Sequence, residues 1–419
     1  MKPILLFIPH YIGSLKYFER IYPHLSDKYD IYFLLLSAKE KHFPSMVEYC
    51  RQKGFKYFEA GRISSSVLTK LPLGKKYLKT RNFRRDADKI LSNYNIAKII
   101  CVNDNSIYLR YLLSQANKRG IDTAVIQWSL SYEYKEDKTM ITRKKGFRGL
   151  AYKLLKPVYI KIRNFIYHLV LGKNLDFVKG VPGAGTARRL GVINTAALNF
   201  FLREGVDPSK ISVIGYMDFH VAETTKNDLD CNTNLRFEVK SKYGLHPEKK
   251  RIMIFTSPYN TNIVDVFDDR GQVDFYDKIV SLVRKVFPSE THEIILKLHP
   301  LERKGIYEKI GKREGVKIFD KEADNFSLVY FADLYIADST TTNFIPMIMG
   351  KDSIFHNFCG LDLIEKSKNY FGIVKYIKDT GEFEDLLKLY SKGNLPSQYD
   401  RRREFYVENS LQKILNWIG

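Results

Sequence analysis

The feature that most constrains the fold of this sequence is a repeated alternation of short apolar runs with segments of helical periodicity. The apolar run Ile4–Pro9 is followed by helix-like spacing over Leu15–Leu25, and the same succession restarts at Arg251–Phe255. Short apolar runs are typical of strands buried on both faces, and their alternation with helices predicts an α/β fold with parallel sheets and crossover helices. Further strands are expected at Asp30–Leu36, Lys56–Glu59, Ala97–Val102, Thr123–Gln127, Phe177–Pro182, Lys210–Tyr216, Glu293–Leu298, Leu334–Ala337 and Asp352–His356.

The length of 419 residues predicts two domains, because one hydrophobic core rarely grows so large. Asp218 to Lys250 is polar and separates two blocks of alternation. We therefore predict a first domain over residues 1–220, a linker over 221–250, a second domain over 251–385 and a tail over 386–419.

Two polar clusters follow predicted strands of the second domain. His299-Pro300 comes directly after Glu293–Leu298, and a run of hydroxyl side chains comes after Leu334–Ala337. Ligands of open α/β sheets bind beyond the carboxyl ends of the strands, so both clusters are candidate binding sites. The hydroxyl run opens an apolar segment that ends at Gly350, which predicts a strand-to-helix turn whose N–H groups suit a phosphate; an ordinary helix N-cap is the alternative.

The charge of the chain predicts an anionic partner, since 68 Lys and Arg against 47 acids give a net charge of +21. Ten of those cations lie in Lys138–Lys173, which contains no Asp or Glu. Aromatic and aliphatic residues are interleaved with these cations. Such an amphipathic basic stretch predicts contact with an anionic membrane, the alternative being a solvated basic loop. A nucleic-acid partner is disfavoured, because no RRM, KH, zinc-finger or helix-turn-helix signature accompanies the charge.

The remaining composition indicates a cytoplasmic protein. The four cysteines, Cys50, Cys101, Cys231 and Cys359, lack the spacing of a zinc site or a disulfide framework. The amino terminus has too short an apolar core for a signal peptide, and no run approaches the ~18 apolar residues of a membrane span. We expect a protein that is peripheral on the cytoplasmic face of the inner membrane.

The motifs of the second half resemble a known family. KLHP, then a helix, a strand, a helix and ADST with MGKDSIFHN downstream, is similar to the second Rossmann-like half of GT-B-fold transferases over roughly Lys249 to Thr380. The HP and later Ser/Thr motifs resemble bacterial sialyltransferases, Kdo transferases and CDP-glycerol glycerophosphotransferases of surface-polysaccharide synthesis. The resemblance implies a GT-B-like fold of two Rossmann-like domains that face a central cleft, with the last helix, Arg401–Trp417, returning to the first domain.

The resemblance also implies a chemistry, the transfer of a sugar from a nucleotide-activated donor, CMP- or UDP-linked, to a polysaccharide or lipid-linked acceptor in capsule or lipopolysaccharide biosynthesis. The HP histidine of the family contacts the donor phosphate, a role that falls on His299. The full predicted donor site is Ser257, His299, Pro300, Ser339, Thr340, Thr341 and Asn343. No acidic pair with DxD spacing follows a predicted strand, so we expect no cofactor and no metal.

Transfer also needs a base for the acceptor hydroxyl, which the first domain supplies in this fold. Asp104 and His10 are the candidates, because each follows a predicted strand, and Glu133 is a third. The alternatives are a turn-forming Asp in an Asn-Asp-Asn cluster and an ordinary loop histidine.

The sequence departs from each related family, which keeps other functions open. Trp128-Ser129 stands where glycerophosphotransferases carry an "HG" pair, the acidic motif of sialyltransferases is absent in clean form, and 2-epimerase elements such as "HVEAG" and "SDSGG" are missing. A CDP-glycerol-type glycerophosphotransferase, a UDP-sugar 2-epimerase and a non-catalytic nucleotide- or glycan-binding relative therefore remain as alternatives.

Overall fold

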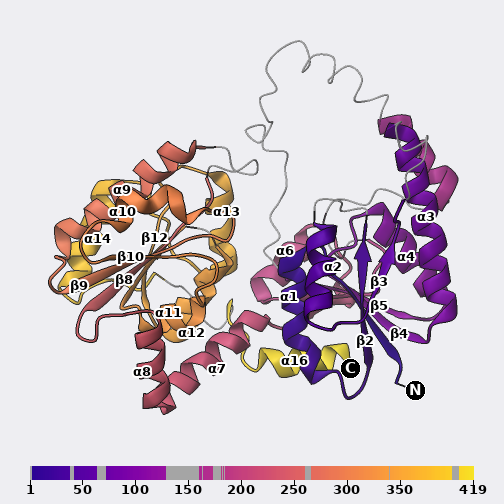
Figure 1. Ribbon diagram of the computed structural model, residues 1–419, viewed down its shortest axis with the longest axis horizontal. Helices are drawn as coiled ribbons and strands as arrows, with labels where there is room; N and C mark the ends of the chain where they lie inside the picture. The colour runs from indigo at the N-terminus through magenta and orange to yellow at the C-terminus, as the bar shows by residue number, and fades with distance from the viewer. Residues whose placement is uncertain are drawn as a thin grey trace, which may run out of the picture. The chain divides into compact units, whose positions relative to one another are not determined.

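The computed structural model describes residues 2–37, 42–63, 72–128, 160–162, 164–172, 181, 183, 185–259, 266–338, 340–398 and 405–419. These residues form two compact units (Figure 1). The first unit contains the described residues up to Met217 together with Asn409–Gly419, and the second contains Asp218–Glu408. Most of basic segment 138–173 lies outside the described residues.

The first unit is built on a seven-stranded sheet of order β3-β2-β1-β4-β5-β6-β7, in which all neighbours are parallel. Its strands are β1 (Ile4–Ile8), β2 (Asp30–Leu36), β3 (Tyr57–Ala60), β4 (Ile96–Cys101), β5 (Asp122–Ile126), β6 (Arg189–Val192) and β7 (Ile211–Val213). The chain runs from β1 outward to β3 and then returns to place β4 on the other side of β1. The strand order therefore reverses between β1 and β4, the position where such sheets open a crevice.

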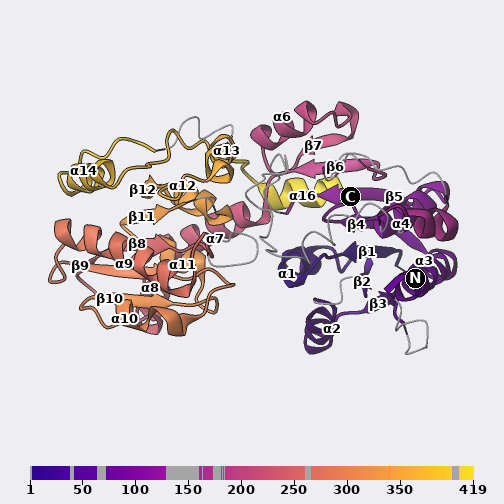
Figure 2. The same ribbon diagram turned by 90° about the horizontal axis from the view of Figure 1, so that it is seen from above.

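The sheet is covered by α1 (Ile12–Ile21), α2 (Phe43–Gln52), α3 (Pro72–Asn93), α4 (Ile107–Lys118), α6 (Thr195–Arg203) and α16 (Ser410–Ile418), and residues 160–162 and 164–171 are also helical. The C-terminal helix α16 lies beside β5 and β6 (Figure 2). The guanidinium of Arg189 lies 4.8 Å from the centre of the Trp417 ring and also donates to the Trp417 carbonyl. Gly215, at φ +85°, lies so close to Ser410 that a Cβ there would stand 2.1 Å from the Ser410 hydroxyl oxygen.

The second unit is built on a five-stranded parallel sheet of order β10-β9-β8-β11-β12. Its strands are β8 (Lys250–Phe255), β9 (His292–Lys297), β10 (Val316–Phe319), β11 (Leu334–Ala337) and β12 (Asp352–Phe355). Its helices are α7 (Met217–Cys231), α8 (Thr233–Lys242), α9 (Asp269–Val286), α10 (Glu308–Gly311), α11 (Asn325–Phe331), α12 (Phe344–Met349), α13 (Asp362–Phe371) and α14 (Thr380–Ser391). Strand order reverses between β8 and β11.

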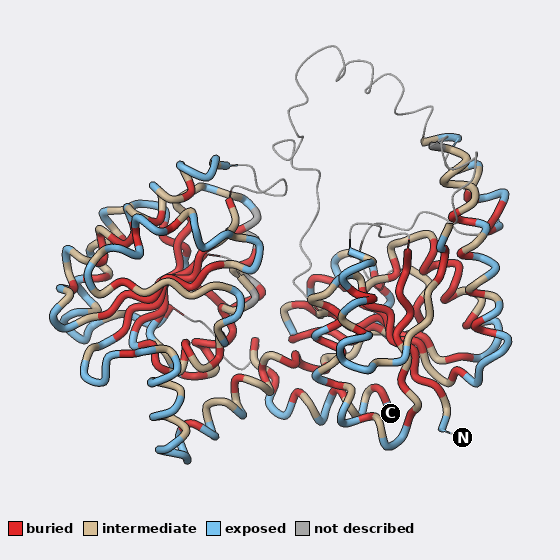
Figure 3. Tube along the Cα trace, viewed as in Figure 1, coloured by how far each residue is buried: buried red, intermediate tan, exposed pale blue. Residues whose placement is uncertain are grey.

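The two parallel sheets confirm the predicted α/β fold class, and the strands of both are largely buried (Figure 3). Within the described ranges, short 3-10 turns lie at Tyr22–His24, Pro208–Lys210, Lys304–Tyr307 and Thr341–Asn343. In the part of the chain that the structure describes, no helix is both long and apolar enough to cross a membrane.

Three local expectations differ from the structure. The polar stretch after Asp218 is helical, as α7 and α8; the Asn232 side chain caps α8 by accepting from the Leu235 N–H at 3.0 Å. The charge and spacing of Arg81–Tyr94 predict a helix there, whereas helix α3 begins earlier, at Pro72. The short strand β6 was not predicted, and the strand expected at Phe177–Pro182 falls on residues outside the described set except Val181. Capping and backbone pairing decided these elements, and apolar periodicity does not report either.

Candidate functional site

The loops that follow β9, β8 and β11 are neighbours at the carboxyl edge of the second sheet, because these strands are adjacent in the order β9-β8-β11. His299 stands in the first of these loops with a partly exposed side chain. Its Nδ1 accepts the main-chain N–H of Leu301 at 3.2 Å. Burial, with a smaller contribution from the charge of Lys297, lowers the pKa of His299 to about 4. The ring is therefore neutral at pH 7 and carries its proton on Nε2, where it is a hydrogen-bond donor.

Glu302 holds the backbone around this histidine. Its carboxylate accepts the N–H of His299 at 2.8 Å, the Gln272 side-chain amide at 2.7 Å and the Tyr307 hydroxyl at 2.5 Å. The hydroxyl of Thr256, directly after β8, donates to the same carboxylate. Four donors from three segments converge on one charged acceptor, and hydrogen bonds to charged groups are the stronger kind. The loops after β8 and β9 are thus fixed to each other.

Asp338 makes the corresponding connection between β8 and β11. Its side chain is buried and accepts the Ser257 hydroxyl at 2.6 Å as well as the Tyr259 hydroxyl. Burial raises the pKa of Asp338 to about 6, although both hydrogen bonds oppose that rise. The N–H of Ser257 donates to the Tyr276 hydroxyl at 2.6 Å. Ser257, predicted to contact the donor, therefore has its hydroxyl and its N–H directed to the scaffold.

The turn after β11 has the predicted strand-to-helix form. Thr340 caps the short 3-10 turn, since its Oγ1 accepts the Thr342 N–H at 3.4 Å and the Thr342 hydroxyl at 3.2 Å. Asn343 is fully buried: its amide donates to the Asp338 carbonyl at 2.5 Å and its oxygen accepts the Tyr335 hydroxyl at 2.9 Å. Asn343 thus shapes the turn from inside, while Thr340 remains partly exposed.

Three predicted site residues are not placed in full. Glu133 and Ser339 lie outside the described residues, and of Thr341 only the backbone is described. Pro300, next to His299, is exposed.

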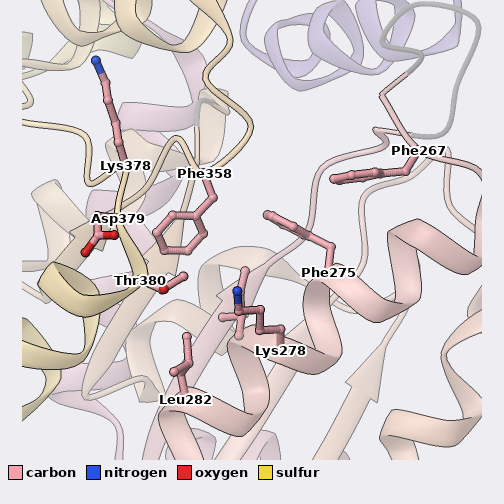
Figure 4. Close-up of a pocket in the computed structure, with 9 residues that line it drawn as sticks. Phe267, Phe275, Lys278, Leu282, Phe358, Lys378, Asp379 and Thr380 are labelled. Carbon is pink, nitrogen blue, oxygen red and sulfur yellow. The ribbon is translucent and has the colours of Figure 1, made fainter.

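A pocket of about 260 Å³ lies beside this edge and contains none of the predicted site residues (Figure 4). Rings of Phe275 and Phe358 line it, with the start of α14 on another side. Directly against the Phe358 ring lies the ring of His356, at 4.6 Å and nearly parallel. His356 is fully buried, and neither of its nitrogens has a hydrogen-bond partner among the described residues; burial lowers its pKa to about 3. One wall of the pocket is therefore aromatic with a neutral imidazole behind it, while Lys278, Lys378 and Asp379 line the rest.

At the carboxyl edge of the first sheet, His10 and Asn103 meet across the strand reversal. His10 follows β1 and Asn103 follows β4; the His10 Nδ1 lies 2.5 Å from the Asn103 side-chain amide. The ring of Tyr11 packs edge-on against Trp128 at 4.8 Å and is 37% exposed. A partly exposed histidine, oriented by an amide and next to aromatic rings, suits proton transfer to or from a ring-shaped ligand.

Asp104 has a different environment from the one a base requires. It is fully buried, and its two oxygens accept the N–H groups of Gly183 at 2.7 Å and Ala187 at 3.3 Å. The side chain of Arg110 donates to the Asp104 carbonyl at 3.4 Å. A carboxylate that accepts two main-chain N–H groups inside the protein anchors the loop before β6, and this geometry favours His10 over Asp104 as the base.

Sequence reasoning missed Glu302, Asp338 and the groups that donate to them. The spacing of Glu302, three residues after His299, is the one available signal, because a Glu at that spacing can accept the N–H of the first residue of a turn. Thr256, Gln272 and Tyr307 are far apart in sequence, and no local pattern relates them.

No protein-family model matches this chain, and no curated protein matches it. Among solved structures, UDP-GlcNAc 2-epimerase from Neisseria meningitidis bound to UDP-GlcNAc aligns with a TM-score of 0.57 at 12% identity, covering 100% of this chain and 99% of that one. The wall teichoic acid polymerase TagF aligns at 0.54 and 14%, covering 99% and 88%, and a glycosyltransferase from Rickettsia africae at 0.53 and 13%, covering 99% and 94%. At these identities the likeness establishes the fold, and the chain has a GT-B-like architecture of two parallel-sheet α/β domains.

Proposed function

We propose that this protein is a nucleotide-sugar-dependent glycosyltransferase that acts without a metal, moving a sugar from a nucleotide-activated donor to a growing surface polysaccharide or a lipid-linked acceptor. The observation that carries the proposal is the neutral His299, whose proton is directed to Nε2 by the Leu301 N–H. Solved structures with this fold support the choice of donor, because they include a 2-epimerase bound to UDP-GlcNAc and a glycosyltransferase.

The proposed donor site lies at the carboxyl edge of the second sheet. When the sugar leaves, negative charge develops on the nucleotide phosphate, and a fixed donor aimed at that oxygen lowers the barrier. In this proposal His299 supplies that donor, and the partly exposed hydroxyl of Thr340, in the turn after β11, is a second polar group at the same edge of the sheet. Glu302 and Asp338 do not touch the donor; they position the loops that do.

The acceptor hydroxyl must lose a proton, and we assign that step to His10. The Asn103 side-chain nitrogen lies 2.5 Å from the His10 Nδ1. A half turn of the Asn103 amide exchanges its nitrogen and oxygen; the oxygen then accepts from an Nδ1–H, which leaves a lone pair on Nε2 for the acceptor proton. In this proposal Asn103 is a positioning residue for the basic tautomer of His10.

The proposed setting is the cytoplasmic face of the membrane, in capsule or lipopolysaccharide synthesis, since a lipid-linked acceptor is presented there. The ten cations of segment 138–173 supply charge of the sign that anionic lipid attracts.

The test is a panel of CMP-, UDP- and CDP-activated donors, each incubated with the protein while released nucleotide and the fate of the sugar are followed. Release of nucleotide from a sugar donor, unaffected by EDTA, is the expected result. Formation of a 2-epimer without nucleotide release, or turnover of CDP-glycerol alone, would replace the proposal with the corresponding alternative. Binding without turnover of any donor would indicate a non-catalytic relative. Loss of activity in EDTA that magnesium or manganese restores would overturn the metal-independent step.

A further inference from the structure

The first unit carries an exposed apolar stripe on a short helix. Residues 160–162 and 164–171 are helical, and Ile162, Phe165 and Leu169 are 39%, 64% and 65% exposed. Their spacing of three and four residues places all three on one face of that helix. Large apolar side chains gathered on one surface, as these are, mark a site of interaction.

The opposite face of the same helix is anchored to the protein, so the stripe has a fixed direction. Tyr167 and Val170 are buried, and the Val170 carbonyl accepts from the Arg84 guanidinium of α3 at 2.6 Å. The amino group of Lys76, also on α3, lies 5.1 Å from the centre of the Tyr167 ring. The helix is therefore held on α3 by one face, and the stripe points away from α3.

The anchoring part of α3 is strongly basic. From Pro72 to Arg85 it carries six cations and no acid, and Lys161 adds one at the start of the short helix. The cations are Lys75, Lys76, Lys79, Arg81, Arg84 and Arg85. Arg81, Arg85 and Lys161 are exposed, whereas Lys79 is buried; Arg85 also pairs with Asp86 at 3.0 Å. An apolar stripe next to a field of one sign fits a surface that is apolar inside and anionic outside.

This surface lies at the end of the first sheet that carries the candidate base. α3 follows β3 and so begins at the carboxyl edge of the sheet, the edge that carries His10. Its 22 residues span about 33 Å, whereas the five residues of β1 span about 17 Å. Figure 1 shows the first turns of α3 projecting past the strand ends.

We propose that Ile162, Phe165 and Leu169, with the cations of the first half of α3, form a docking surface for an anionic phospholipid membrane. The proposal rests on the proposed function for its purpose, which is to hold the carboxyl edge of the first sheet near lipid-linked acceptors. Apolar side chains enter the headgroup region while the cations meet lipid phosphates, as in interfacial helices.

Two changes separate the apolar from the electrostatic contribution. Phe165→Glu with Leu169→Glu is expected to weaken binding to vesicles of phosphatidylglycerol and phosphatidylcholine at least about tenfold, because it places charge in the headgroup region. Arg81→Gln, Arg85→Gln and Lys161→Gln together should weaken it by about a hundredfold, at roughly fivefold for each cation, and less at high salt. The controls are Phe237→Glu, at a residue 73% exposed on α8, and Lys309→Gln on α10 with Lys312→Gln just after it.

The experiment is vesicle flotation with the full chain, in the absence of any donor. The same flotation is done with pure phosphatidylcholine vesicles, and binding to DNA is measured separately. Loss in both test variants and none in the controls is expected. Equal binding to pure phosphatidylcholine, or DNA binding that the cation variant loses and the Phe165 variant keeps, would overturn the proposal. The proposal would also be overturned if the wild type were a dimer that Phe165→Glu dissociates while vesicle binding stays unchanged. Donor turnover in vesicle-free buffer is scored separately: its absence with vesicle binding present counts against the transferase, and the reverse counts against the docking surface.

Discussion

The carboxyl edges of the two sheets are built from different kinds of side chain. In the second unit, Glu302 and Asp338 collect hydroxyl, amide and main-chain donors from three loops, and His299 is held within that network. In the first unit, the His10 imidazole bonds to the Asn103 side chain and has aromatic rings beside it. A rigid polar network suits the binding of a donor phosphate, whose position must be fixed. A histidine with fewer hydrogen bonds suits an acceptor that enters and leaves in each catalytic cycle.

Replacing His10 tests the first half of this comparison and should have the largest effect. His10→Ala is expected to lower the rate of transfer by about 10²–10⁴, the usual contribution of a general base. Donor affinity, measured by calorimetry, should stay close to that of the wild type, because the donor is assigned to the other unit.

Asp104→Asn is the control for His10→Ala, because Asp104 is the other predicted base and follows β4 directly after Asn103. One of its oxygens becomes an NH₂ group that faces a main-chain N–H, so we expect a loss of about 1–3 kcal/mol in unfolding free energy with turnover per folded molecule kept. A folded Asp104→Asn protein with a rate lowered by about 10², beside an active His10→Ala protein, would return the base role to Asp104.

Removing His299 tests the second half. His299→Ala removes the Nε2–H donor and should raise the barrier by about 2.7–4 kcal/mol, or about a hundredfold or more in turnover. His292→Ala, at the opposite end of the same strand, is the control that should turn over normally. Near-normal turnover in His299→Ala would show that the donor phosphate is held elsewhere.

The sequence predicted the positions of the strands better than the roles of the residues after them. Buried parallel strands such as Leu334–Ala337 are apolar throughout, so composition alone reveals them. The position of His299 beyond a strand was likewise visible. The hydrogen-bond partners of Asp104 and Asn343 could not be predicted. Gly183 reaches Asp104 from a segment 79 residues away, and the bond from Tyr335 to Asn343 depends on how the turn after β11 folds back on its strand.

The polar network itself can be weakened at a single atom. Tyr259→Phe removes the hydroxyl that donates to Asp338 and leaves a buried carboxylate oxygen without that donor. We expect a loss of about 1–3 kcal/mol in unfolding free energy, measured by urea titration. Tyr11→Phe in the first unit is the control; its ring is 37% exposed, so the loss should be much smaller. Equal losses would contradict the contrast between a fixed and a lightly held edge.

The last prediction concerns pH and the buried His356, next to the second network. Burial lowers its pKa to about 3, so between pH 6.5 and pH 3 the unfolded chain binds a proton at this residue that the folded chain does not. Stability is therefore lost as pH falls through that window and is unaffected by this group above it. His356→Phe keeps a flat ring against Phe358 and removes the titration. Its stability relative to the wild type, measured by urea unfolding, should improve by about 2 kcal/mol between pH 8 and pH 5, at 1.36 kcal/mol for each pH unit below 6.5. Asp338 also titrates near this range, but it is present in both proteins and cancels in the difference. A difference that does not change with pH would mean that the imidazole is reached by solvent or by a partner that accepts its proton, and the aromatic wall of the neighbouring pocket would then have to open.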